Sequence, residues 1–108
     1  YKFDGPYKMN DAAHTKIADN WTDLTDGTID AYLNKTETGA THPDAPSYTW
    51  TAVGTNGVYD VRGTCNNWTS NNAAIDGGNG WSGSVTSLWT SSASHNCSIV
   101  KPLFCCQQ

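Results

Sequence analysis

The residues of this chain that could do chemistry are aromatic rings and amides. Trp81 lies in a segment rich in glycine, asparagine and serine, residues 70–84, which we expect to form an irregular loop. An exposed indole can stack on a sugar ring, and neighbouring amides supply planar donors and acceptors for the sugar hydroxyls. For each tryptophan the alternative is packing in the core, and for each amide it is a hydrogen bond that stabilises a loop. The residues expected at such a site are Trp81, Asn71, Asn72, Asn79, Asp76 and Tyr59.

Asp76 and Trp81 also fit part of an Asp-box, the pattern D-x-G-x-x-W, with Ala74 in place of its leading serine. In that motif the carboxylate caps a hairpin turn and the indole packs beneath it, so a structural role is the second interpretation. Asp60 and Asp76 are also the carboxylates that could form an oxygen site for a cation. The alternative is that both are solvated loop residues.

The chain lacks residues that the catalytic motifs considered would require. A nucleophile elbow, G-x-S-x-G, would need glycine at position 84, where the chain has Ser84. The three histidines, at positions 14, 42 and 95, are far apart and lack metal-ligand spacing. The ten carboxylates are scattered, and nothing selects a pair. We therefore expect a protein that is not an enzyme and has no catalytic residue.

Length, charge and cysteine content limit the class of protein. The 108 residues suffice for one domain with a modest core. A net charge of −4 without a basic run argues against nucleic acid as a partner. No apolar stretch approaches the roughly 20 residues that cross a bilayer, so we expect no membrane insertion. Because the chain begins at Tyr1, we expect a processed product or a fragment. Four cysteines predict disulfides and a secreted or cell-surface location.

Strand and loop should dominate, with little helix, because the polarity comes from Asn, Ser and Thr (mean hydropathy −0.55, 15% charged residues). Residues 48–53 alternate with period two and predict a strand. A turn at 55–57 and a short strand at 58–61 should follow. Residues 34–47, with their glycine and prolines, predict a loop, and residues 99–106 predict a closing strand.

Cysteines and tryptophans recur in a distinctive order in the second half of the chain. The motifs are Trp50-Thr-Ala, Cys65-Asn-Asn-Trp-Thr-Ser, Leu88-Trp89, Cys97 and Leu103-Phe-Cys-Cys-Gln-Gln. This order resembles the second half of a C-type-lectin-like domain, most closely the endostatin-like branch of bacterial secreted and surface proteins. The resemblance implies strands opening at Cys65 and running through Trp89. It implies an α+β fold, mostly β and loop, over residues 1–108, with the family's N-terminal helical half missing.

The same resemblance implies a disulfide between Cys65 and Cys97. Cys105 takes the place of the last-strand cysteine, whose family partner lies in the missing half, and Cys106 departs from the family pattern. Adjacent strand residues face opposite sides. The two could form a strained vicinal bond, link two chains or stay free. An alternative pairs Cys106 with Cys97 or Cys65.

Calcium binding in this family uses Glu/Gln-Pro-Asn/Asp in the long loop and Trp-Asn-Asp in the tryptophan strand, because a hard cation prefers oxygen ligands. Here the second place reads Leu88-Trp-Thr-Ser, and the first motif is missing. We therefore expect no metal or other cofactor, and binding that is independent of calcium.

These features predict an extracellular binding or adhesion module that recognises a glycan or a surface protein through loops 34–47 and 70–84. The alternative is a structural subunit or tip of an extracellular fibre, assembled as a homo-oligomer such as a trimer or filament. A lectin-like core without its helices would expose an apolar sheet face that other subunits could cover. Asn34-Lys-Thr is a sequon in a predicted loop, so Asn34 is the candidate for glycosylation.

Overall fold

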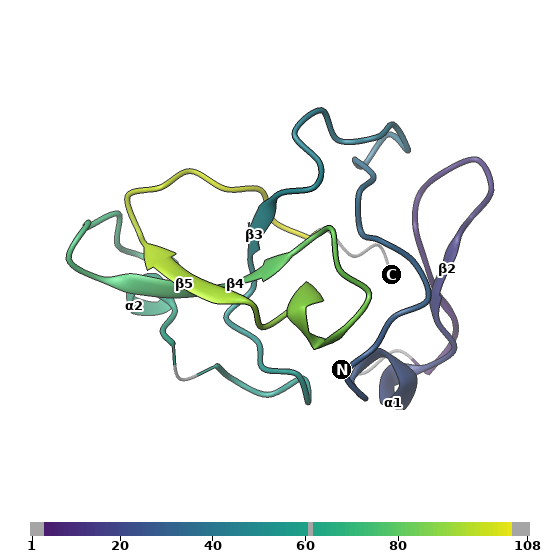
Figure 1. The fold of residues 1–108 in the computed structure, drawn as a ribbon, viewed down its shortest axis with the longest axis horizontal. Helices are drawn as coiled ribbons and strands as arrows, with labels where there is room; N and C mark the ends of the chain where they lie inside the picture. Colours follow the sequence, from purple (N-terminus) through teal and green to yellow (C-terminus); the bar gives the residue numbers. More distant parts are fainter. Residues whose placement is uncertain (1–3, 61, 105–108) are drawn as a thin grey trace.

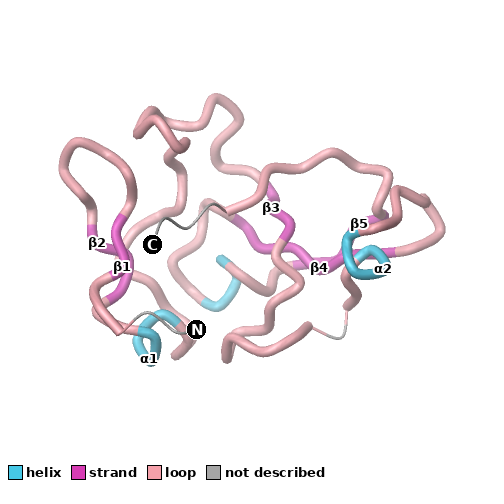
Figure 2. Tube along the Cα trace, turned by 180° about the vertical axis from the view of Figure 1, so that it is seen from behind, coloured by secondary structure: helices cyan, strands magenta, loops and turns pink. Residues whose placement is uncertain are grey.

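Two small antiparallel sheets form the regular framework and lie toward opposite ends of the long axis (Figures 1 and 2). The computed structural model describes residues 4–60 and 62–104. One sheet pairs β1 with β2, and the other has the order β3-β4-β5. A chain of mostly strand and loop with little helix is thus confirmed. The elements are β1 (Tyr7–Lys8), β2 (Lys16–Ala18), α1 (Trp21–Leu24), β3 (Tyr48–Trp50), α2 (Cys65–Trp68), β4 (Asp76–Trp81), η1 (Ser87–Trp89) and β5 (Ala93–Asn96).

β4 is the central strand of the larger sheet, with β3 on one edge and β5 on the other. Trp81 pairs with Tyr48 of β3, and Gly77 pairs with His95 of β5. The prediction of an irregular loop over residues 70–84 is therefore wrong for its middle part. Glycine is depleted in strands, so a glycine-rich sequence gives little sign of one.

Two of the three glycines of β4, Gly77 and Gly80, are required because neighbouring groups lie directly against the strand on its two faces. A Cβ on Gly77 would lie 2.7 Å from the Cys65 sulfur and 3.0 Å from the Trp50 ring. A Cβ on Gly80 would overlap the carbonyl oxygen of Trp89. The strand lacks these side chains because its neighbours occupy the space, which is a known reason for glycine inside a sheet.

The strand predicted at 48–53 ends at Trp50, so the prediction is confirmed only for its first half. Val53 and Tyr59 then form an isolated antiparallel bridge on either side of the turn predicted at 55–57, which is confirmed. The strand predicted after this turn is reduced to that single bridge, because no further pairing extends it within the described chain.

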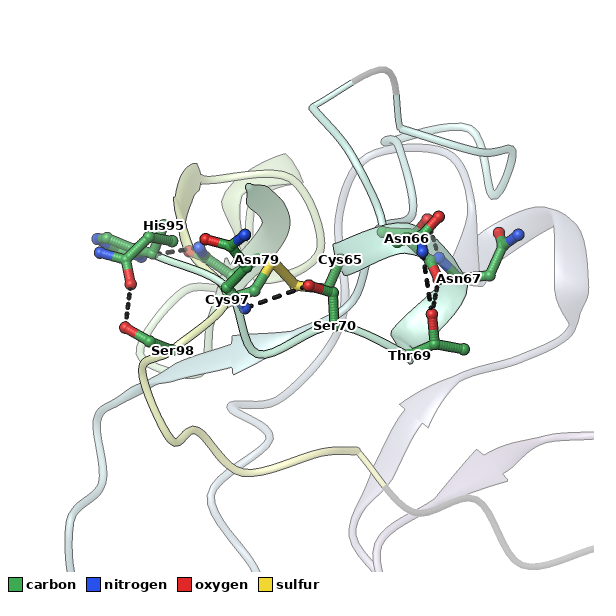
Figure 3. The surroundings of a disulfide bond; sticks show 12 residues. Cys65, Asn66, Asn67, Thr69, Ser70, Asn79, His95, Cys97 and Ser98 are labelled. Carbon is green, nitrogen blue, oxygen red and sulfur yellow. Dashed lines mark hydrogen bonds between the residues drawn. A yellow bond between two sulfur atoms is a disulfide. The ribbon is translucent and has the colours of Figure 1, made fainter. Parts of the chain in front are cut away.

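A disulfide joins Cys65 to Cys97, as predicted (Figure 3). The two Cα atoms lie 5.6 Å apart, and the cysteines are separated by 32 positions in sequence. Closing a loop of this length stabilises the folded state by about 3–4 kcal/mol in the chain-entropy model. The predictions for Cys105 and Cys106 lie outside the described residues.

The strand predicted to open at Cys65 is wrong, because this segment forms α2, one turn of left-handed helix. All four residues of α2 have positive φ, between 51° and 62°. Asparagine tolerates this conformation better than most residues, and two of the four are Asn66 and Asn67. The Thr64 hydroxyl accepts a hydrogen bond from the Asn67 N–H at 3.0 Å, which caps the turn.

The segment after β5 returns across the molecule to β3, as the yellow loop of Figure 1 shows. The Trp50 N–H donates to the carbonyl of Pro102 at 3.1 Å, and Leu103 forms a parallel bridge with Trp50. The closing strand predicted at 99–106 is therefore a single bridge as far as residue 104. Trp89 is likewise not in a strand, because η1 is a turn of 3-10 helix.

The interior of the described chain is held by hydrogen bonds as much as by apolar packing. Thr51 Oγ1 donates to the Thr90 carbonyl at 2.6 Å, and Thr90 Oγ1 donates to the Val53 carbonyl at 2.9 Å. These bonds tie the end of β3 to the segment after η1. The buried apolar residues are Ile17, Ala18, Ile29, Ala52, Cys65 and Cys97, and the buried polar ones are Thr49, Asp60, Asn79, Ser82, Ser84 and Thr90.

Asp60 is the buried charge of this interior, with 5% of its surface exposed. Its carboxylate pairs with the Arg62 guanidinium at 2.9 Å and accepts a hydrogen bond from the Ser91 hydroxyl at 3.1 Å. Burial alone would raise the pKa of Asp60, but the hydrogen bonds and charge of Arg62 and the bond from Ser91 outweigh it and lower that pKa. Asp60 is therefore ionised although it is buried, because Arg62 and Ser91 compensate for its lost hydration.

The close approach at Gly80 leads to a stability prediction. Gly80→Ala should lower the free energy of unfolding by about 3 kcal/mol, because its Cβ would meet backbone that cannot rotate away. Urea unfolding followed by tryptophan fluorescence measures the loss.

Gly78→Ala is the matched control within the same strand. A Cβ there would make ordinary contacts of 3.4 Å with Ala52 and Asp60. Its unfolding free energy should stay within about 1 kcal/mol of the wild type. Equal urea midpoints for Gly80→Ala and the wild type would contradict the packing described here.

Candidate functional site

An aromatic pair marks one end of the larger sheet. Tyr48 begins β3 and Trp81 ends β4, directly opposite each other. Cross-strand partners point to the same face of a sheet, and the ring centroids lie 4.7 Å apart at an interplanar angle of 53°. Tyr48 is 36% exposed and Trp81 is partly exposed, so the pair presents aromatic surface to solvent.

A cleft of about 250 Å³, partly lined by hydroxyl and amide side chains, lies beside Trp81 of this pair. It forms where the loop before β3 meets the turn after β4. Ser47 N–H donates to Ser82 Oγ at 2.8 Å, and Ser82 N–H donates to the Ser47 carbonyl at 3.0 Å. A Cβ on Gly83 would lie 2.8 Å from Trp81 Nε1, so the indole borders the wall of the cleft. The lining residues are Tyr32, Asn34, Thr41, Ala45, Pro46, Ser82 and Gly83.

His95 contacts the other side of this aromatic surface. Its ring meets Tyr48 edge-on at 4.8 Å, and its Nδ1 accepts a hydrogen bond from Asn79 Nδ2 at 2.8 Å (Figure 3). The neutral ring then carries its proton on Nε2. Burial lowers the pKa of His95, the Lys101 charge lowers it further, and the Asp76 charge raises it. The net direction is down, so the imidazole is neutral at pH 7.

Lys101 extends over the aromatic face from the returning C-terminal segment. Its Nζ lies 5.3 Å from the Tyr48 ring centroid and 5.2 Å from that of Trp50. Both distances are within cation–π range. Burial lowers the pKa of Lys101 from its ordinary value. Trp50 in turn meets Trp68 of α2 with centroids 6.0 Å apart, which extends the aromatic face toward the disulfide.

The structure separates Asp76 from Trp81. They are the two ends of a six-residue strand, about 17 Å apart at the usual rise per residue. The Asp-box turn is therefore wrong. Asn71 and Asn72 lie on an exposed loop, and Asn72 Oδ1 accepts a hydrogen bond from the Ala74 N–H at 2.8 Å. This bond matches the loop-stabilising alternative for Asn72.

Asn79 and Tyr59 also lie away from the expected site. Asn79 has no exposed surface, so the prediction that its amide lies on a binding loop is wrong. Tyr59 is 63% exposed but sits on the bridge with Val53, and no ring contact within the described chain joins it to Trp81. Asn34 lines the cleft, and its glycosylation stays a prediction.

Three residues of this surface were missed by sequence reasoning: Tyr48, His95 and Lys101. Tyr48 could have been found, because period-two alternation places it on the same face as Trp50. His95 and Lys101 gave no such signal, since each reaches the face only through the pairing of β5 with β4 and the return of the C-terminal segment.

A second cleft of about 250 Å³ lies between α1 and the end of β3. Aromatic and aliphatic side chains dominate its lining, among them Trp21, Leu24, Val53, Trp89 and Phe104. Its surface is more strongly apolar than that of the cleft beside Trp81. The cleft beside Trp81 has the larger polar share of surface and an aromatic border, so it is the better candidate for a binding site that orients a polar ligand.

No family model, curated protein or solved structure matches the chain. The C-type-lectin-like resemblance therefore stays a prediction. Among the described residues, no group of three or more His, Cys, Asp or Glu side chains could hold a metal ion. The same part of the chain contains no helix that is both long and apolar enough to cross a membrane.

The charges around His95 lead to a prediction for its titration. Histidine NMR shifts should report a pKa below the ordinary 6.5. Lys101→Met should raise this pKa, because it removes a positive charge that disfavours the imidazolium. Asp76→Asn should lower it, because it removes a negative charge that favours the imidazolium.

Lys8→Met removes the same charge from the exposed strand β1 and should leave the His95 titration unchanged. The folded state resists protonation of His95, so the neutral ring favours folding. Its full contribution to the free energy of unfolding is therefore present above pH 6.5. It is lost as the pH falls through the lowered pKa. A lowered His95 pKa in Lys101→Met, or a raised one in Asp76→Asn, would contradict this arrangement of charges.

Proposed function

We propose that this chain is an extracellular, non-enzymatic binding module that recognises a glycan. The observation that carries the proposal is the cleft beside the Trp81 indole, which in turn pairs with the ring of Tyr48. Stacking on an aromatic ring covers the apolar face of a sugar, while hydroxyl and amide groups in the cleft can pair with its hydroxyls. The cleft falls where parts of the two predicted binding loops, 34–47 and 70–84, meet.

The size of the cleft suits one sugar of a longer chain. Pockets for drug-sized ligands measure about 300–1,000 Å³, and this cleft is slightly smaller. The ligand would occupy it with one residue and extend across Tyr48 and Trp81. Recognition would not need calcium, because the pairing groups are aromatic rings, hydroxyls and an amide.

We also propose a C-type-lectin-like fold of the endostatin type and a secreted or cell-surface location. The Cys65–Cys97 bond supports both, since it links the two cysteines that the resemblance pairs. Structural disulfides persist in oxidising compartments. The left-handed turn at α2 and the 3-10 turn at Trp89 depart from the strands that the resemblance implies.

Glycan binding should depend on the ring pair. In an array of neutral and acidic oligosaccharides, Trp81→Ala and Tyr48→Ala should each weaken binding about tenfold, because each removes part of the stacking surface. Addition of EDTA should leave wild-type binding unchanged.

Tyr59→Ala is the matched control, because it removes an exposed tyrosine from a different hairpin. It should retain wild-type affinity. Equal losses in Tyr59→Ala and Trp81→Ala would mean that the site is elsewhere. Loss of binding in EDTA would contradict calcium independence. If no glycan of the array binds, glycan recognition is contradicted.

The second candidate is a structural subunit of an extracellular fibre. Large apolar side chains are exposed, including Val100 at 96% and Leu103 at 65%. The accessible surface is 6554 Å², whereas a folded monomer of this mass exposes about 5,800 Å². Burial of this excess between copies would stabilise a trimer or a filament.

Self-association is measured by light scattering at increasing concentration. If the chain is a fibre subunit, the mass should rise above the monomer, and a Val100→Ser, Leu103→Ser variant should restore the monomer by removing the apolar contacts. Leu88→Ser, at another exposed leucine, serves as the control. A monomer at all concentrations would count against this second candidate.

A further inference from the structure

Among the residues that the structure describes, Lys101 is a cation on the proposed binding surface without an ion-pair partner. The returning C-terminal segment holds this residue in place, because the Trp50 N–H bonds the Pro102 carbonyl and Leu103 pairs with Trp50. The ammonium group therefore lies over the rings of Tyr48 and Trp50 rather than extending freely into solvent.

No carboxylate of the described residues pairs with Lys101. The ion pairs in that part of the chain use Lys16 and Arg62. Aromatic faces attract the ammonium through their quadrupoles, but they do not accept its three strong hydrogen bonds. A half-buried ammonium without a carboxylate has lost hydration that an anionic partner would replace. The lowered pKa of Lys101 has the same cause, its burial.

The position of Lys101 connects it to the stacking surface. Tyr48 contacts Trp81 at 4.7 Å on one side, and Lys101 Nζ lies 5.3 Å from the same ring. The substituents of a sugar stacked on this pair would therefore lie near the ammonium group of Lys101. His95, which is neutral, offers an N–H donor at the same ring.

We infer that the glycan is acidic and that Lys101 binds its carboxylate. This inference rests on the proposed function and adds the class of sugar, a uronic or sialic acid. A single cation suits one carboxylate, whereas densely sulfated chains are bound by clusters of basic residues. This chain has only six Lys and Arg and no basic run.

The test compares each acidic sugar with its own methyl ester, which keeps the shape and removes the charge. The probes are oligosaccharides that end in glucuronate, galacturonate or sialate, each paired with its ester, titrated by calorimetry into the whole chain. At least one acid should bind about tenfold tighter than its ester, because a charge-assisted hydrogen bond is lost in the ester. This preference should shrink at high salt.

Variants assign the preference to Lys101. Lys101→Met keeps the apolar stem and should bind acid and ester equally, whereas Lys101→Arg keeps the charge and should keep the preference. Lys8→Met removes the same charge from β1 and should bind as the wild type does. Circular dichroism verifies that each variant is folded.

The outcomes separate this inference from the proposed function. If the wild type binds acid and ester equally, the ligand class is wrong while glycan binding stands, a result that needs no variant. If a folded Lys101→Met protein still prefers the acid to its ester, Lys101 does not bind the carboxylate and the inference is wrong. If neither form of any probe binds, and neutral oligosaccharides do not bind either, the proposed function fails together with the inference.

Discussion

The absence of side chains along much of β4 is the constraint on which the rest of the structure depends. Gly77 lets the disulfide and Trp50 contact the strand on one face, and Gly80 lets the backbone of Trp89 contact it directly. Because a small chain has little apolar material to bury, bringing backbone against backbone gives a close-packed interior without a large hydrophobic core. Three distant parts of the chain thereby meet at one short strand.

Hydrogen bonds and one covalent link complete what apolar burial does not supply. Threonine hydroxyls bridge the end of β3 to the segment after η1. Asp60 is ionised inside the molecule because Arg62 and Ser91 pair with it. The Cys65–Cys97 bond fixes the left-handed turn α2 beside the sheet. An interior of this kind depends on geometry more than on composition, since each bond needs its partner at the correct distance.

The candidate site follows from the same strand. β4 ends at Trp81, and its pairing with β3 brings Tyr48 opposite that residue. Its pairing with β5 brings His95 onto the same face, and the returning C-terminal segment adds Lys101. The cleft beside Trp81 forms where the chain turns after β4. The proposed binding surface thus assembles from four segments that are distant in sequence, each held through β4 or β3.

The sequence by itself determined the low helix content, the first half of the strand at 48–53 and the turn after it, because these follow from local patterns of polarity and turn residues. A family resemblance in the sequence also indicated the Cys65–Cys97 pair. Tertiary structure alone decided that the glycine-rich segment is a central strand, that Asn79 is buried and that His95 joins the aromatic face. Glycine carries no local preference for a strand. Glycine occurs in β4 because the disulfide, the Trp50 ring and the Trp89 backbone lie directly against this strand. These groups come from other parts of the chain, so the sequence of the segment alone does not reveal the strand.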